Sequence, residues 1–381
     1  MTGPLTGLRV LSLAEQYPGP YATLLLADLG ADVVLVERPG LGDPSRQFGP
    51  FFESLARGKR SVALDLKDPE GIAALMALCS QSDVLLEGYR PGTMQRLGAG
   101  YEQVSEVNPR LVYASISGFG QDGPYRDRPA HDVSYQAVAG HLHERLESPG
   151  RSPAPSLALG DLSAGLFAVV GVLAGLQQRE RTGRGTHVDV SMTDGLVSLL
   201  TAHLVPVVNR LGPPAFPYEP GYGVFATADG QLLALSVAHE DHFWRQLCAA
   251  CELDDLVKLR SAERLERYDE LVERIAETVA ARDRPGWQQR LADHEVPHAW
   301  VNDLDGVAQD PQVRARGMFV TVPAEQDHPA RVHVRQPLRF DGDAPAPHSH
   351  APGVGAQTRE VLLAAGCPSE VVDRLVARAS T

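Results

Sequence analysis

The chain of 381 residues contains only four cysteines, Cys79, Cys248, Cys251 and Cys367. Their irregular spacing does not form a disulfide framework and is typical of a protein from a reducing compartment. Cations are also scarce, because 35 Lys and Arg face 48 Asp and Glu and leave a net charge of −13. Binding along a nucleic-acid backbone requires clustered cations, so we expect no nucleic-acid partner. A local cationic pocket for a small phosphorylated ligand is compatible with this balance.

Long apolar runs are missing too. The longest nearly uncharged stretch, 162–178, is diluted by Gly165, Gly171 and Gly175, and its strongly apolar part is shorter than the ~20 residues of a membrane span. No cationic region precedes an apolar run at the N-terminus, which argues against a signal peptide. We therefore expect a cytoplasmic protein that has no membrane partner. The content of 43% hydrophobic and 22% charged residues excludes collagen-like, coiled-coil and wholly disordered chains.

The N-terminal third alternates strand-like and helix-like segments. Helices are predicted at Pro20–Leu29 and Pro69–Cys79. Short runs of branched apolar residues predict strands at Leu8–Leu13, Ala31–Glu37, Ser61–Leu66, Asp83–Glu87 and Leu111–Ser117. This alternation favours a parallel sheet with right-handed crossovers, a Rossmann-like α/β arrangement. The first strand is not followed by the G-x-G-x-x-G motif, so a tightly held dinucleotide is not expected.

The rest of the chain predicts a second, smaller domain. A buried helix at Asp161–Gln177 and a strand at Thr186–Ser191 come first, and a proline-rich linker follows at Pro213–Pro220. Two strands joined by an Asp-Gly turn and several helices then form a smaller α+β domain. Ala344–Pro352 is a second connector, and Thr358–Ala379 is expected to close the chain as one helix.

Asp161 stands at the start of the Gly/Ala-rich helix. One interpretation is an N-cap, in which the carboxylate accepts a free backbone N–H of the first turn. The other is a carboxylate that faces a ligand, is stabilised as an anion by the helix N-terminus, and acts as nucleophile or base. The two interpretations are compatible.

His131 and Asp132 follow the glycine-rich loop 118–124, and open α/β sheets bind ligands in loops after strand ends. The position makes His131 a candidate for chemistry. The basic turn 57–60 is either solvated or in contact with a phosphate. His141 and His143 form an H-x-H pair without further ligands, so we expect no metal site.

Cys248 and Cys251 form a C-x-x-C pair inside a predicted helix. A redox motif would stand at a strand–helix junction, and a zinc site would need two more ligands. The pair is therefore expected to pack within its helix.

Several motifs together resemble the family III CoA-transferases, the group that includes formyl-CoA and carnitine-CoA transferases and α-methylacyl-CoA racemases. The resemblance covers roughly the first half of the chain, and the second half is similar in layout. The motifs are Leu5–Leu11 with Gly19-Pro20, Leu29–Val33 with Val36–Arg38, Arg57–Ser61 with Leu64–Lys67, Glu87–Gly92, Gly118–Gln121, Gly160-Asp161 and Thr182–Gly185.

The resemblance implies a fold, an assembly and a substrate. A large Rossmann-like domain would be built from residues 1–212 and 326–381, with a smaller α+β domain at 221–325, and two chains would interlock as a homodimer. CoA, carried as an acyl-CoA substrate, would lie across the large domain. By matching position, Arg38 and Lys67 would contact its adenosine and phosphates, and Arg90 and Arg96 its phosphates or thioester arm. Tyr135 would also line the CoA site.

The family contains two chemistries. In transferases, the aspartate matching Asp161 attacks the acyl-CoA thioester as a nucleophile. In racemases, one base removes the α-hydrogen of a 2-methylacyl-CoA and an acid on the other face returns a proton. Racemases resemble this chain at His131 and at Glu240, which implies a His131–Glu240 dyad on one face and Asp161 on the other.

Two departures separate the chain from particular members. The stretch Leu162–Gly165 looks as much like transferases as racemases, and Pro220–Gly223 stands where formyl-CoA transferase has a glycine-rich flap. We expect a 2-methylacyl-CoA racemase. The alternatives are a CoA-transferase that forms an aspartyl-CoA thioester, and a CoA-binding protein without turnover.

Overall fold

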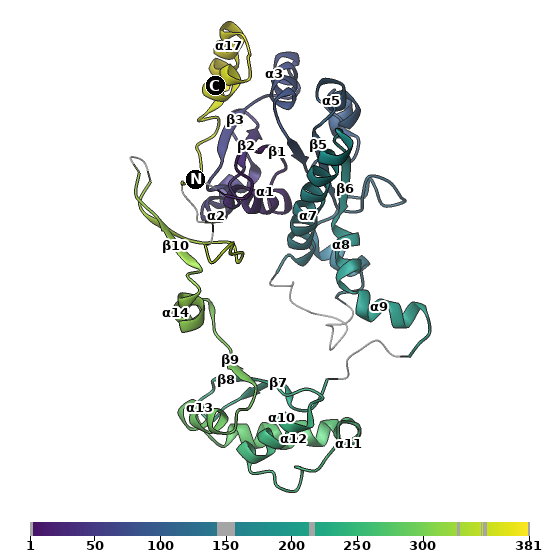
Figure 1. Ribbon diagram of the computed structural model, residues 1–381, viewed down its shortest axis with the longest axis vertical. Coiled ribbons are helices and arrows are strands. Elements are labelled where there is room, and N and C mark those ends of the chain that lie inside the picture. Colours follow the sequence, from purple (N-terminus) through teal and green to yellow (C-terminus); the bar gives the residue numbers. More distant parts are fainter. Residues whose placement is uncertain are drawn as a thin grey trace. The chain divides into compact units, whose positions relative to one another are not determined.

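The computed structural model describes residues 3–142, 157–212, 218–325, 328–343, 345 and 349–379. The chain divides into two units, Met1–Thr201 with Gly317–Thr381, and Ala202–Arg316. The second unit therefore interrupts the first in sequence, and the colours of Figure 1 follow this order. We describe each unit by itself. The expected domain limits at 212, 221 and 325 stay a prediction.

The branched apolar runs of the first unit form one parallel sheet of six strands, in the order β3-β2-β1-β4-β5-β6. Central β1 pairs with both β2 and β4, so that Val10 lies between Val33 and Val84. The α/β fold expected from the sequence is confirmed. The strands are β1 (Arg9–Leu13), β2 (Asp32–Glu37), β3 (Arg60–Ala63), β4 (Val84–Glu87), β5 (Val112–Ser117) and β6 (His187–Ser191).

The strand order has a consequence for ligand binding. The chain runs outward in one direction from β1 to β3 and in the other from β4 to β6. The crevice between β1 and β4 is thus a topological switch point, and in open α/β sheets ligands bind there, outside the carboxyl ends of the strands.

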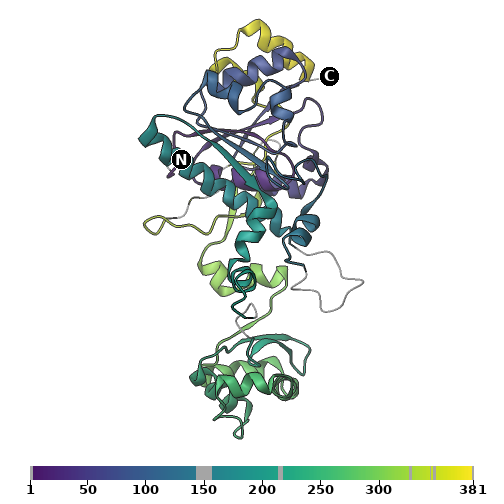
Figure 2. The same ribbon diagram turned by 90° about the vertical axis from the view of Figure 1, so that its right-hand side faces the viewer.

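Side chains alternate between the two faces of the sheet, and each face is covered by helices. Leu11 and Leu13 of β1 pack into a core with α3 (Pro69–Ser80), α5 (Tyr101–Val107) and the C-terminal helices. Val10 lies in the opposite core, which contains α1 (Pro18–Asp28) and α7 (Leu159–Thr182). Figure 2 shows the yellow C-terminal helices beside blue α3.

Helix α7 is longer than the sequence suggested. It runs for 24 residues and is long and apolar enough, by length and composition alone, to cross a membrane. The expectation of a stretch too short for this was wrong. One side of α7 is buried, through residues such as Ala164, Ala168 and Val172. Gly165 permits close contact with α1, because a Cβ there would lie 2.9 Å from the Pro18 carbonyl oxygen.

The end of the chain covers the edge of the sheet at β3. The backbone N–H of Ser61 donates to Oε1 of Gln357 at 2.8 Å, and that of Ala63 donates to Oγ1 of Thr358 at 3.0 Å. The N–H of Gln357 in turn donates to the Ser61 carbonyl. Polar groups that would be free on an edge strand are therefore paired within the chain.

The expected single C-terminal helix is two helices, α16 (Thr358–Ala364) and α17 (Ser369–Ala379). Gly366 between them has a φ of 82°, which favours glycine, and Pro368 lacks the N–H that would continue a helix. The prediction overlooked these two breakers in an otherwise periodic segment.

The basic turn 57–60 does not match either interpretation at two of its positions. Arg57 is 1% exposed and forms a bidentate ion pair with Asp28. Lys59 is 5% exposed and donates to the Pro20 carbonyl and to Oγ1 of Thr23. Burial, and then the nearby charge of Arg57, lower the pKa of Lys59 to about 7. Both cations contact α1, and neither faces solvent.

The second unit has its own core around a three-stranded antiparallel sheet. Trp244 and Trp287 are fully buried in it, and each indole N–H donates to a backbone carbonyl at 2.9 Å. Cys248 and Cys251 are buried free thiols in α10, which confirms their packing role. The elements are β7 (Tyr222–Ala226), β8 (Leu232–Ser236), β9 (His298–Trp300), α10 (Asp241–Cys251), α11 (Ser261–Glu266), α12 (Tyr268–Ala280), α13 (Arg284–Asp293), α14 (Leu304–Gln309) and α15 (Pro311–Ala315).

The remaining elements are short and connect the others. Parts of both predicted connectors, 213–217 and 344 with 346–348, lie outside the described residues, as does His143. The elements are the 3-10 helix η1 (Pro44–Phe48), α2 (Pro50–Ala56), α4 (Thr93–Arg96), α6 (Asp132–Val138), α8 (Met192–Leu199), α9 (Thr201–Val208), β10 (Phe319–Val322) and β11 (Arg331–Val334).

Candidate active site

A pocket of about 590 Å³ opens at the carboxyl ends of β1, β4 and β5. This is the switch point of the sheet, where ligand binding is expected. Residues Ala14–Gln16 follow β1, Gly88–Pro91 follow β4, and Gly118–Phe119 follow β5. Four residues that the sequence singled out meet on its walls, namely Asp161, His131, Arg90 and Tyr135.

Asp161 is not the N-cap of its helix. Ala158 occupies the N-cap position of α7, and Asp161 lies within the first turn. The capping oxygen comes from Asp132 instead, whose Oδ1 accepts the N–H of Gly160 at 2.7 Å and that of Asp161 at 3.2 Å. The N-cap interpretation was therefore wrong in its residue, and a carboxylate from α6 satisfies the free donors. Because Asp132 takes that role, the side chain of Asp161 is left to face the pocket.

Burial is the main influence on the Asp161 carboxyl. Burial, and then the negative charge of nearby Asp132, together raise the pKa of Asp161 to about 7. A carboxyl group with a pKa near 7 is present both as base and as acid at neutral pH, which suits proton transfer.

His131 precedes α6 as its N-cap residue and makes no side-chain cap hydrogen bond. It is exposed and lines the same pocket as Asp161. The next turn of α6 brings in Tyr135, whose hydroxyl donates to the Ala130 carbonyl at 2.8 Å. Burial, and then the charge of Asp161, raise the pKa of Tyr135 to about 12, so the phenol stays neutral at physiological pH. A Cβ at Gly118 would lie 2.5 Å from the Tyr135 ring, which explains the glycine there.

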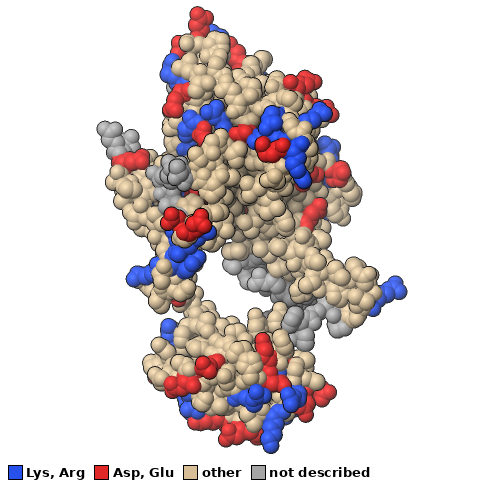
Figure 3. Space-filling view, in the orientation of Figure 1, with Lys and Arg blue, Asp and Glu red and all other residues tan. Residues whose placement is uncertain are grey.

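The cations proposed for CoA lie at the same edge of the sheet. Arg38 follows β2 and forms an ion pair with Glu15 at 3.5 Å, with 57% of its side chain exposed. Lys67 follows β3 and is exposed, and Arg96 in α4 donates to Thr93. Arg90 lines the pocket, whereas Arg38, Lys67 and Arg96 are outside its wall. Figure 3 shows cations and anions interspersed over the face drawn.

Sequence reasoning missed two further cations of the pocket, Arg126 and Arg128. Both stand in the loop between β5 and α6, a few residues before His131. Their place in the loop that carries a candidate catalytic residue was the available signal.

Glu240 belongs to the second unit, where it is the half-buried N-cap residue of α10 without a side-chain cap hydrogen bond. Its predicted pairing with His131 stays a prediction. Among the described residues, no group of three or more His, Cys, Asp or Glu side chains is placed to hold a metal ion.

Comparison with known proteins finds relatives that match nearly the whole chain. A family model described as CoA-transferase family III matches residues 5–358. Succinyl-CoA:glutarate CoA-transferase of Mus musculus is 33% identical over 94% of this chain and 86% of its own length. Alpha-methylacyl-CoA racemase of Homo sapiens is 34% identical over 97% of this chain and 96% of its own length.

Among solved structures, the orthorhombic form of Rv3272 from M. tuberculosis superposes with a TM-score of 0.85 and 30% identity. The match covers 94% of this chain and 99% of that one. The resemblance inferred from the motifs is confirmed. The chain thus belongs to CoA-transferase family III, a family of enzymes that act on CoA thioesters.

Proposed function

We propose that the protein is a 2-methylacyl-CoA racemase that moves the α-proton between the two faces of its substrate. The observation that carries the proposal is the presence of His131 and Asp161 on the walls of one pocket. A racemase needs two acid–base groups around one carbon atom, and imidazole and a carboxyl group with a pKa near 7 both exchange protons readily at neutral pH.

In this reaction the α-hydrogen leaves as a proton to one group, and its electron pair forms an enolate delocalised onto the thioester oxygen. The other group then donates a proton to the opposite face of the carbon, and the thioester is restored with inverted configuration. No atom is gained or lost, and each turnover exchanges the protonation states of the two groups. His131, with Glu240 as its predicted partner, serves one face, and Asp161 serves the other.

A CoA-transferase is the second candidate. Among the described residues, no side chain donates a hydrogen bond to the Asp161 carboxylate, so it is available as a nucleophile. Attack on an acyl-CoA would give a mixed anhydride and release CoA thiolate. The thiolate would attack the enzyme carbonyl, releasing the acyl carboxylate, and an acceptor acid would then take CoA through a second anhydride. The succinyl-CoA:glutarate CoA-transferase of Mus musculus, at 33% identity, is about as similar to this chain as the human racemase, at 34%.

Solvent deuterium separates the two reactions, because exchange of carboxylates never breaks the α-C–H bond. The protein should be incubated with a single epimer of a 2-methylacyl-CoA in deuterated buffer, with and without an acceptor acid, and the thioester analysed by mass spectrometry. A racemase incorporates one deuterium without the acceptor. An absence of deuterium together with CoA transfer to the acceptor would replace the racemase by the transferase.

The proposed CoA site consists of Arg38, Lys67, Arg90, Arg96 and Tyr135. Its support is that the four cations follow β2, β3 and β4 at the carboxyl edge of the sheet, around the pocket that contains Asp161. In this arrangement the nucleotide end of an extended CoA molecule lies outside the pocket, at the exposed cations, and its thioester end lies inside the pocket.

Charge reversal at Arg38 should therefore weaken CoA more than a short pantetheine thioester. A hydrogen bond to a charged group contributes about 1.5–3 kcal/mol, so the affinity for CoA should fall roughly ten- to a hundredfold in Arg38→Glu. Calorimetric titration with both ligands measures the difference. Arg110→Glu is the matched control. Arg110 precedes β5 and so lies at the amino ends of the strands, whereas the proposed CoA site lies at their carboxyl ends. An equal loss for both ligands would remove Arg38 from the nucleotide site.

Asp132→Asn should shift the acid limb of the pH profile of kcat/KM to lower pH. The charge of Asp132 raises the pKa of Asp161, and the amide removes that charge while its oxygen can still accept the Gly160 N–H. Asp161 then remains a base at lower pH. Asp122→Asn, at an exposed position of the preceding loop, should leave the limb in place. A shift to higher pH in Asp132→Asn would contradict this coupling.

We also propose a cytoplasmic, interlocked homodimer. Association of two chains is supported by an exposed apolar strip on α7, where Leu166, Phe167 and Val170 have 50%, 37% and 61% of their surface accessible. Apolar patches of this kind commonly mark protein interfaces. Light scattering at micromolar concentration should give the mass of a dimer that separates only on unfolding. A stable folded monomer would contradict the assembly.

A further inference from the structure

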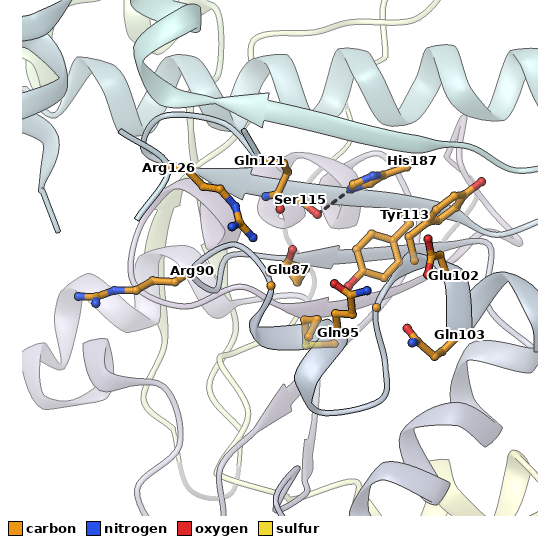
Figure 4. Close-up of a pocket in the computed structure, with 14 residues that line it drawn as sticks. Glu87, Arg90, Gln95, Glu102, Gln103, Tyr113, Ser115, Gln121, Arg126 and His187 are labelled. Carbon is orange, nitrogen blue, oxygen red and sulfur yellow. Dashed lines mark hydrogen bonds between the residues drawn. The ribbon is translucent and has the colours of Figure 1, made fainter. Parts of the chain in front are cut away.

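A second cavity, of about 270 Å³, lies beside the Asp161 pocket and is separate from the acid–base groups. Figure 4 shows its walls, which come from β4, β5 and β6, from α4 and α5, and from the loop after β5. Arg90 and Arg126 line both cavities. In Figure 4 the Arg126 side chain points into the smaller cavity, whereas the Arg90 side chain extends away from it.

The cavity contains buried polar atoms without partners. Nε2 of Gln121 and Nε of Arg126 are buried donors that no described group accepts, and Oε1 of Gln103 is a buried acceptor in the same state. A buried polar group left unpaired costs about 1–3 kcal/mol, so such atoms are normally satisfied by water or by a ligand. Two unsatisfied donors from one loop indicate a ligand that supplies acceptors.

The backbone near these donors is shaped by its surroundings. The backbone N–H of Gln121 donates to Oδ2 of Asp189 at 3.0 Å. A Cβ at Gly92 would lie 3.1 Å from Nη2 of Arg126, and the φ of Gly92 is 79°, so the loop after β4 leaves room for the guanidinium. The cavity therefore has room for the Arg126 guanidinium, whose Nη1 lies 3.9 Å from the Asp127 carboxylate and whose side chain is 40% exposed.

The floor of the cavity is polar and buried. Ser115 is 2% exposed, and its hydroxyl lies 2.9 Å from Nε2 of His187. Glu87 is 5% exposed and accepts the N–H of Tyr89 at 2.8 Å. Burial, and then the charge of Asp189, raise the pKa of Glu87 to about 7 against the hydrogen bonds that lower it. Tyr101 stacks on the His187 ring at 5.2 Å and closes one side.

We propose that this cavity binds a short-chain carboxylate, whose oxygens accept from the Arg126 guanidinium and from Nε2 of Gln121. A carboxylate supplies only acceptors, and guanidinium–carboxylate contacts are among the stronger hydrogen bonds of proteins. At about 30 Å³ for each water, the cavity holds the equivalent of roughly nine waters, which suits an acid of a few carbon atoms. Glu87 and Glu102 in the wall disfavour a dianion such as a phosphate ester. The site goes beyond the proposed reaction at Asp161.

Calorimetric titration of the full chain with butyrate, in the absence of CoA, tests the site. Butyramide has nearly the same shape without the charge, and inorganic phosphate tests for general anion binding. We expect butyrate to bind and the other two to bind at least tenfold more weakly. Loss of one hydrogen bond to a charged group should weaken butyrate about ten- to a hundredfold in Gln121→Leu.

Three further variants, compared with Gln121→Leu, locate the ligand. Glu87→Gln removes a buried negative charge and should strengthen butyrate roughly three- to tenfold at pH 8, whereas Glu102→Gln, at an exposed position, should change it less than twofold. His131→Ala, in the neighbouring pocket, should leave butyrate affinity unchanged. Circular dichroism and thermal melting establish that each variant is folded.

The outcomes are decisive in both directions. Weakening by Gln121→Leu with no effect of His131→Ala supports the site. Equal binding of butyramide, tighter binding of phosphate, or loss of butyrate in His131→Ala with none in Gln121→Leu would overturn it. Because no turnover is measured, failure here leaves the racemase and transferase proposals untouched, and their failure leaves this site untouched.

Discussion

An Asp161→Asn variant should racemise 2-methylacyl-CoA about 10²–10⁴-fold more slowly than the parent protein, because a positioned acid–base group contributes a factor of that size. Affinity for the thioester should change little, since the amide has the shape of the carboxyl and the backbone N–H of residue 161 still donates to Asp132. Epimer separation on a chiral column measures the rate, and calorimetry measures the affinity.

His131→Ala should stop inversion to a similar extent for the same reason. The two variants differ in deuterium exchange, because each group serves its own face. Exchange on the face served by Asp161 should survive in His131→Ala, and exchange on the other face should survive in Asp161→Asn. Ser134→Ala is the matched control, since Ser134 lines the pocket and does not titrate in this range.

The transferase predicts a different pattern. Asp161→Asn would abolish CoA transfer, His131→Ala would be tolerated, and intact-protein mass spectrometry would detect a CoA adduct that depends on Asp161. A rate of inversion within threefold of the parent rate in both variants would mean that neither group takes part in the reaction.

Asp28→Asn should lower the free energy of unfolding by about 3–5 kcal/mol, the usual cost of removing one partner of a buried ion pair. Arg57 has 1% of its side chain exposed and Asp28 2%, so the remaining guanidinium would be charged and buried without its counter-charge. Arg57 also donates to the Val334 carbonyl, which ties α1 to β11. Chemical denaturation, monitored by far-ultraviolet circular dichroism, measures the decrease in the free energy of unfolding.

Two controls separate burial from charge. Asp373→Asn removes one partner of an exposed pair with Arg359 in the same unit, in which 58% of the Asp373 side chain and 55% of the Arg359 side chain are accessible, and should cost at most about 1 kcal/mol. The double variant Asp28→Leu with Arg57→Met replaces the pair by apolar side chains and should recover most of the loss. A cost below 1 kcal/mol in Asp28→Asn would mean that the pair is solvated in solution.

Local patterns were sufficient to predict the sheet. β2 and β5 are short runs rich in branched or aromatic residues, so composition alone indicates a strand. The same reasoning failed at 358–379, where the period of apolar residues continues across Gly366 and Pro368, although these two residues end the helix.

Features that depend on distant partners could not be predicted. Arg57 is a surface residue by type, and its burial depends on two distant partners, Asp28, 29 residues earlier, and the Val334 carbonyl. The cap of α7 comes from Asp132, 28 residues before Gly160. His131 and Asp161 were identified separately, and their presence in one pocket follows from the crossover that brings α6 beside α7. Arg126 carried no signal beyond its loop.

The hydrogen bonds between β3 and the end of the chain have a consequence for biosynthesis. Ala63 and Thr358 are 295 positions apart, which at about 5–20 residues per second means a delay of roughly 15–60 s on the ribosome. During that time the outer strand of the nascent sheet displays unpaired N–H groups, while the inserted unit emerges and can fold on its own core. The period is one in which a chaperone that shields strand edges would protect the polypeptide from self-association.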